Sequence, residues 1–199
     1  MALTYPLSLP DSIGIAQIEL RAANAVTTSQ SPFTFKQQVF KHQGQRWEAS
    51  VSIPAIRRDL AADWKAFLVG LNGQQGTFLL SDPDYDLPRG SARNCTGTGT
   101  IGESTLEVIM TGTLLAGDYI NLGGVGSANA KLYMVLENLS GSGTLKIWPS
   151  LRSSTSPSGD PVYLQSPTGV FRLRDNISSW QISDSSTYGI SFECVEALT

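Results

Sequence analysis

Apolar and polar residues alternate along much of this chain, and a period of two predicts β-strands. The clearest case is RWEASVSI at 46–53, where Trp47, Val51 and Ile53 share one side and polar residues occupy the other. Pro54 follows and is expected to end that strand. The first half of the chain therefore contains at least one half-buried strand.

Weaker alternation predicts strands at 12–23 and 34–40, and an apolar run at 76–80 predicts a short buried strand. Within 12–23 the phase of the alternation changes, because Ile13 and Ile15 fall on the opposite parity from the later apolar residues. Such a change predicts a β-bulge near Ala16.

Between these strands, residues 57–71 repeat their apolar positions at helical spacing. Leu60, Trp64, Phe67 and Leu68 fall on one face of the predicted helix and should be buried. Asn-Gly follows at 72–73, and both residues tolerate the left-handed conformation that ends helices. We expect this helix to be the longest in the protein and to lie across a β-sheet.

The second half of the chain shows no helical period. Residues 90–104 are small and polar and predict a linker or long loop. Short strands separated by turns are predicted after it, at 105–110, 118–122, 130–136, 143–149, 161–164, 169–174, 180–183 and 188–198. The first five of these have the dimensions of a small antiparallel barrel.

The predicted fold is mainly β. Residues 1–90 and 165–199 are expected to form one β-sandwich or barrel domain with a packed helix, because neither segment can bury its apolar faces alone. Residues 91–164 are expected to be a small antiparallel barrel inserted into that domain. Strand 46–53 should lie near the strand at 188–196.

The composition argues against several classes of function. Charged residues make up 16% of the chain, against about 25% in an average protein. The net charge is −3 and basic residues form no stripe, so a specific nucleic-acid ligand is not expected. Apolar runs are shorter than a membrane span, and the first residues show no secretory pattern, so neither membrane insertion nor secretion is expected.

Candidate chemistry is sparse. The one histidine, His42, is predicted to lie in a polar turn without a nucleophile motif nearby. GTGTIG at 97–102 matches a dinucleotide-binding pattern by letter, but a predicted strand follows it where the motif requires a helix. Cys95 and Cys194 lack metal-type spacing; they could pair, although reduced thiols are expected. We therefore expect no cofactor and no catalytic machinery.

The acidic run SDPDYDLPRG at 81–90 is the most unusual local feature. A calcium loop beginning at Asp82 would require Gly at its sixth position and Glu at its twelfth, but these positions hold Leu87 and Arg93. No metal site is therefore expected. Its prolines keep the run extended, which lowers the entropy lost when a partner orders it. The run is expected to be a subunit contact through Asp84, Tyr85, Asp86 and Arg89; catalysis by the Asp84–Asp86 pair is the alternative.

Residues 46–84 follow a specific order: a Trp-bearing strand that ends at Pro54, a helix of the form DWxAFLxxLxGxxGxF, and a strand that ends in Asp82-Pro83. This order resembles the N-terminal domain of distal tail and minor tail proteins of long-tailed, siphovirus-type bacteriophages. Further along, GDYINL, LYMVLENLSGSGTLKIWP and GVFRLR resemble the inserted barrel and returning strand of some such proteins. One branch of that family carries a barrel of the oligonucleotide/oligosaccharide-binding type, so the resemblance implies an inserted barrel of that type at 91–164.

The resemblance implies a non-enzymatic structural protein of the virion, made in the host cytoplasm. It implies a baseplate or tail-tip ring, expected to be a hexamer, that links the tail tube to tail-tip or hub proteins. The alternative is a carbohydrate-binding β module for host recognition, with Trp148 and Tyr163 as the aromatic candidates for stacking on sugars.

Overall fold

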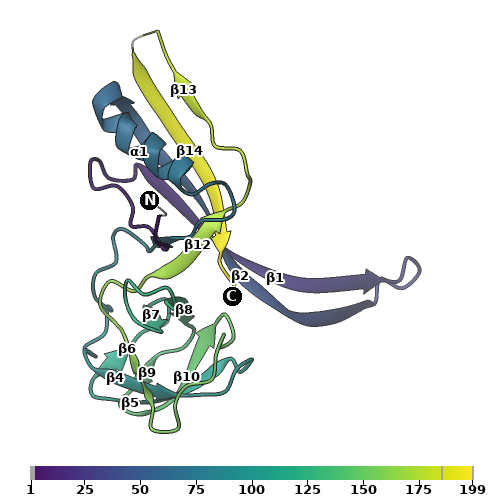
Figure 1. The fold of residues 1–199 in the computed structure, drawn as a ribbon. Helices are drawn as coiled ribbons and strands as arrows, with labels where there is room; N and C mark the ends of the chain where they lie inside the picture. Colours follow the sequence, from purple (N-terminus) through teal and green to yellow (C-terminus); the bar gives the residue numbers. More distant parts are fainter. Residues whose placement is uncertain (1–2, 185, 199) are drawn as a thin grey trace.

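The computed structural model describes residues 3–184 and 186–198. The protein is mainly β, with one helix among the described residues, and its strands form two separate groups joined by the chain (Figure 1). The large sheet and the helix lie at one end, and a small barrel lies at the other. The predicted fold class, a mainly β protein with one packed helix and a small antiparallel barrel, is confirmed.

The large sheet is antiparallel in the order β1-β2-β14-β12-β3, with β13 also paired to β14. The central pairing joins β14 to β2, with Cys194 opposite Ala49, as the alternation in both segments predicted. The members of this sheet are β1 (Gln17–Gln30), β2 (Gln37–Arg57), β3 (Phe78–Leu80), β12 (Gly169–Leu173), β13 (Trp180–Ile182) and β14 (Thr187–Glu196).

Helix α1 (Arg58–Gly70) buries its apolar face on the large sheet. Trp64, Phe67 and Leu68 are buried, as the helical spacing predicted. The Trp64 ring lies 5.9 Å from that of Phe67 and 6.3 Å from that of Phe192 on β14. After the helix Asn72 adopts a positive φ, which the Asn-Gly pair predicted.

Six strands form the barrel in the order β11-β4-β5-β10-β8-β7, and all their pairings are antiparallel. Asn121 and Tyr163 exchange two backbone hydrogen bonds of 2.9 Å between the two edge strands, which nearly closes the barrel. The strands are β4 (Cys95–Thr98), β5 (Thr105–Met110), β7 (Tyr119–Leu122), β8 (Lys131–Val135), β10 (Gly143–Trp148) and β11 (Asp160–Val162). A further two-stranded pair joins β6 (Thr113–Leu114) to β9 (Leu139–Ser140).

Two hydrophobic cores correspond to these two groups of strands. One lies between α1 and the large sheet, and the other fills the barrel. They meet where Leu132, Met134 and Trp148 of the barrel pack against the core of the large sheet. Whether residues 91–164 fold independently of the rest stays a prediction.

Three local predictions are wrong. Strand β2 continues through Pro54. The proline lies where the pairing with β14 is irregular, so its missing N–H breaks no regular hydrogen bond between the strands. Strand β1 starts at Gln17, so the predicted bulge near Ala16 is instead a strand boundary. The segment 90–104 is not entirely a loop, since its residues 95–98 form β4 against β5.

Candidate functional site

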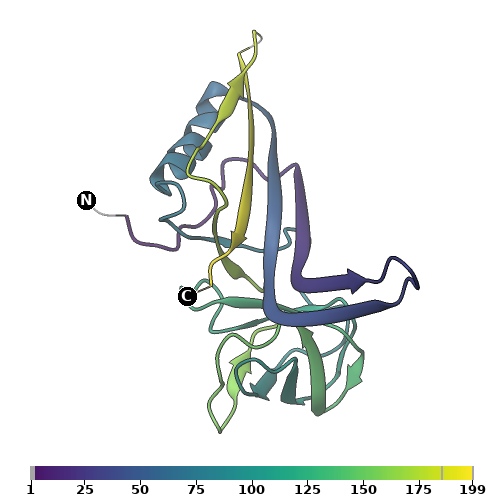
Figure 2. The same cartoon turned by 90° about the vertical axis from the view of Figure 1, so that its right-hand side faces the viewer.

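Strands β1 and β2 form a hairpin that is longer than the other strands of the large sheet. Its outer part bends away from the body and projects into solvent (Figures 1 and 2). The bend is explained by a β-bulge, where Asn24 pairs with Gln45 but Val26 already pairs with Lys41, so that one residue of β1 lies opposite three residues of β2. We call residues 24–44 the arm; His42 lies within its strand β2, so the prediction of a turn at this residue is wrong.

The arm exposes large apolar side chains. Phe33 and Phe35 at its tip are 91% and 72% exposed, and Val26, Val39 and Phe40 on its strands are also exposed. The arm contains Lys36 and Lys41 but no acidic residue. A solvent-exposed two-stranded ribbon is marginally stable by itself. Exposed apolar clusters of this kind mark surfaces that a partner covers.

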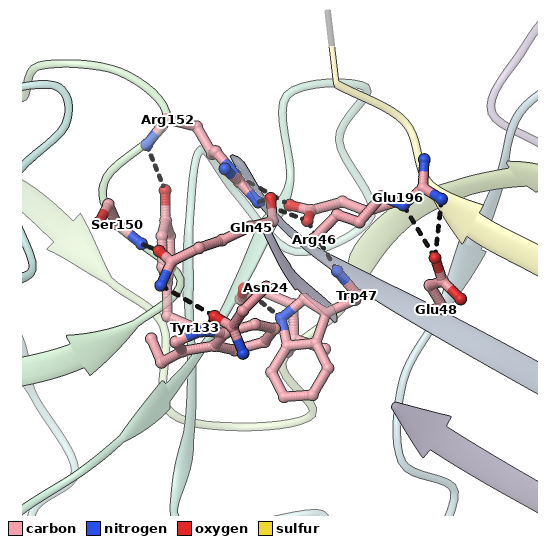
Figure 3. A network of polar contacts seen from close by, with 11 residues as sticks. Asn24, Gln45, Arg46, Trp47, Glu48, Tyr133, Ser150, Arg152 and Glu196 are labelled. Atoms are coloured by element: carbon pink, nitrogen blue, oxygen red, sulfur yellow. Dashed lines mark hydrogen bonds and ion pairs between the residues drawn. The ribbon is translucent and has the colours of Figure 1, made fainter. Parts of the chain in front are cut away.

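The base of the arm is joined to the barrel by a buried ion pair (Figure 3). Arg152, from the loop after β10, donates to Glu196 at the end of β14 at 2.7 Å, and their side chains are 15% and 3% exposed. Glu196 also accepts the backbone N–H of Trp47 at 3.1 Å. Arg152 donates a further hydrogen bond of 2.6 Å to the carbonyl oxygen of Gln45. The pair therefore links the barrel to both β2 and β14.

Side-chain amides extend this junction to the first residue of the arm. Asn24 Oδ1 accepts hydrogen bonds from the Trp148 indole N–H at 2.9 Å and from Gln45 Nε2 at 3.2 Å (Figure 3). Gln45 in turn accepts the backbone N–H of Ser150 at 2.8 Å. The Trp47 indole donates to the carbonyl oxygen of Leu132 on β8 at 2.9 Å. These bonds hold the direction of the arm relative to the barrel.

The acidic run bridges the large sheet and the barrel. The Tyr85 hydroxyl donates to the carbonyl oxygen of Tyr119 at 3.1 Å. Burial, reinforced by the nearby Asp118 carboxylate, raises the pKa of Tyr85. Asp118 is fully buried and accepts from the backbone N–H of Arg89 at 3.1 Å and of Leu115 at 2.8 Å. Two of the four predicted contact residues thus hold the barrel in place within the same chain.

The two acids of the predicted contact, Asp84 and Asp86, differ in their hydrogen bonds. Asp86 accepts a hydrogen bond of 2.9 Å from the Ser166 hydroxyl. This bond joins the segment that precedes the barrel to the segment that follows it. Asp84 is exposed, and its backbone N–H donates to Asp82 Oδ1 at 3.0 Å. Asp84, Asp86 and Arg89 all keep exposed surface. A role of the run in subunit contact stays a prediction, and so does the alternative of catalysis by Asp84 and Asp86.

The aromatic candidates for sugar stacking lie in different places. Trp148 packs edge-on against Trp47, with ring centroids 4.5 Å apart, and its N–H is bonded to Asn24. Tyr163 lies where the barrel closes and is 39% exposed. Trp148 therefore contributes to the junction, while Tyr163 keeps part of its ring available.

Sequence reasoning missed the residues of the junction. Glu196 carried a usable signal, because it shares the parity of the buried Ile190 and Cys194 on β14, and an acid on the buried face of a strand requires a partner. Arg152 gave no such signal, since it lies in a polar loop. Within residues 3–184 and 186–198, no three His, Cys, Asp or Glu side chains form a group that could hold a metal ion.

Cys95 and Cys194 are both unpaired and buried, each in one of the two cores. Burial raises the pKa of Cys95 to about 11 and that of Cys194 to about 12. Since the thiolate is the reactive form, neither thiol should react with a disulfide reagent at about pH 8 in the folded protein. Both should react after unfolding in guanidinium chloride, and rapid modification of the native protein would contradict this.

The search of protein-family models finds no match to this chain, and the search of curated proteins also finds none. No helix in the described part of the chain is long and apolar enough to cross a membrane.

Proposed function

We propose that this protein is a non-enzymatic structural subunit of a bacteriophage tail tip. It would form a ring, expected to be a hexamer, between the tail tube and the tip or hub proteins. The order of elements in residues 46–84 that resembles distal tail proteins supports this proposal. The observation that carries it is the arm, a long ribbon whose exposed apolar tip requires a partner.

The distribution of charge and apolar surface supports contact between copies of the chain. A second apolar patch lies at residues 175–184, where Ile177, Trp180 and Ile182 are 85%, 37% and 63% exposed. This segment contains two acids and no base, whereas the arm contains two lysines and no acid. An arm that docks on this different surface of the next copy makes a head-to-tail contact, and such contacts form a ring when the rotation between copies closes.

Removal of the arm tests the proposal. Residues 25–44 are replaced by Asn-Gly, a two-residue turn suited to join the paired residues Asn24 and Gln45. We expect the shortened protein to stay folded but to lose ring formation, as measured by native mass spectrometry and electron microscopy. A matched control is Ile109→Ser, which removes an equally prominent apolar side chain from the barrel, where the side chain is 73% exposed.

Rings formed equally well without the arm would show that the arm does not drive assembly. The place of the protein in the virion needs a separate measurement. Antibodies against the purified protein should label one end of the tail in particles produced from the genome that encodes this chain. Intact particles that contain none of the protein would contradict the proposal as a whole.

The carbohydrate-binding alternative has less support. Stacking on a sugar requires an accessible aromatic face, and Trp148 is held between Trp47 and Asn24 at the junction. Tyr163 remains as a candidate. Binding on a glycan array that is lost in Tyr163→Ala would favour this alternative over a purely structural role.

A further inference from the structure

A cavity of about 550 Å³ lies at the base of the arm, between β2, the barrel and the end of the chain. Its size is within the range of ordinary ligand pockets. Its walls come from three separate parts of the sequence: β2 with Lys41, the barrel with Ile101, Lys131 and Arg152, and the end of the chain with Leu198.

The charges that line this cavity are all positive. Lys41 reaches it from the arm, and Lys131 and Arg152 reach it from the barrel, whereas no Asp or Glu is among its lining residues. The carboxylate of Glu196 acts on Lys131, but it is 6% exposed and already bonded to Arg152. Lys41 and Lys131 therefore leave an excess of positive charge in the cavity.

Lys131 is the most unusual of these groups. It is half-buried at the start of β8, and burial lowers the pKa of its ammonium group. The neighbouring Arg152 lowers that pKa further, and Glu196 acts in the opposite direction. Within residues 3–184 and 186–198, the structure gives its ammonium no hydrogen bond and no ion pair. An anion close to this ammonium group would favour its charged form.

The remaining walls are apolar or neutral. Ile101 and Leu198 are 61% and 51% exposed, so their side chains offer apolar surface to an occupant. Gln43 and Ser104 add neutral hydrogen-bonding groups. A small inorganic anion would leave the apolar walls uncovered. A peptide segment would use all three kinds of surface, because it combines carboxylates, apolar side chains and backbone amides.

We propose that this cavity binds an acidic, partly apolar polypeptide segment of a partner protein. Carboxylates of the segment pair with Lys41 and Lys131, and its apolar side chains cover Ile101 and Leu198. Arg152 lines the cavity, but its guanidinium group already forms the ion pair with Glu196. Because Lys41 also lies in the arm, Lys131 separates the two proposals: it lines the cavity but is outside the arm, so Lys131→Gln should weaken peptide binding and leave ring formation unchanged.

The test uses the full chain and a fluorescein-labelled short peptide of alternating Glu and Leu, with binding followed by fluorescence anisotropy. Lys41→Gln together with Lys131→Gln should weaken binding by about tenfold, since two solvent-accessible ion pairs of less than about 1 kcal/mol each are lost. The control pair, Lys36→Gln with Lys146→Gln, changes the net charge equally but lies outside the cavity lining. It should change the affinity by less than about twofold, because distant exposed charges are screened by salt.

A further variant guards against loss of binding through misfolding. Ile101→Glu places a negative charge on an exposed wall without disturbing either core, and it should weaken binding by a similar factor. Thermal unfolding of each variant checks that it is folded. Equal affinity for a peptide with Gln in place of Glu, or an equal loss in the control pair, overturns the proposal. Binding of inorganic pyrophosphate without binding of the acidic peptide also overturns it and indicates a small-anion site.

Discussion

Replacement of Trp64 by Ala should lower the free energy of unfolding by about 3–5 kcal/mol, the usual cost of emptying a large aromatic core site. Trp64 is 1% exposed and packs between α1 and the large sheet. Its ring contacts Phe67 on the helix and Phe192 on β14, so the helix would lose its main anchor to the sheet. Urea unfolding followed by circular dichroism measures the change.

A pair of Trp→Phe variants separates packing from hydrogen bonding. The Trp64 indole N–H is buried without a hydrogen-bond partner among the described residues, whereas that of Trp47 donates to Leu132 at 2.9 Å. Trp64→Phe removes an unsatisfied donor, while Trp47→Phe leaves a carbonyl oxygen without its donor. Trp64→Phe should therefore cost less stability than Trp47→Phe, and the reverse order would show that lost packing outweighs the hydrogen bond of Trp47.

The second large effect is expected at the junction. Arg152→Ala should destabilise the protein by about 3–5 kcal/mol, because it leaves the Glu196 carboxylate buried without its charged partner. Glu196 keeps the backbone N–H of Trp47 as a donor, but among the described residues it has no second ion pair to balance a charge that is 3% exposed at the side chain. Chemical denaturation measures the loss.

Two further variants show whether the lost pairing is the cause. Arg152→Ala combined with Glu196→Gln removes the unpaired charge, so the double variant should be more stable than Arg152→Ala alone. Lys146→Ala breaks the exposed pair with Glu137, whose side chains are 54% and 62% exposed, and it should cost less than about 1 kcal/mol. An equal cost for the exposed and the buried pair would contradict this account of the junction.

Helices and strands that bury one apolar face could be predicted from the sequence. The helix was predicted within one residue at each end because its apolar stripe is uninterrupted. The strand at 105–110 was predicted with its observed ends because Leu106, Val108 and Met110 share one side and turn residues flank the segment. Pairing of β2 with β14 followed from alternation in both strands, since matching apolar faces must share a core.

Predictions failed where the pattern is weak or where the outcome depends on a distant segment. Strand β4 was taken for a linker because CTGT is small and polar, and it is held as a strand by β5 and β11. The outer part of β2 lacks alternation because both of its faces are exposed. The arm was therefore invisible as one continuous ribbon.

The sequence by itself determined the mainly β class, the position of the helix and the alternating faces that build the two cores. These properties depend on near neighbours along the chain, and periodicity reports them directly. Tertiary structure decided how the arm is directed, what the acidic run contacts, and which charges meet at the junction. Arg152, Glu196 and Gln45 are brought together from distant positions, and local pattern shows which face is buried but not which partner covers it.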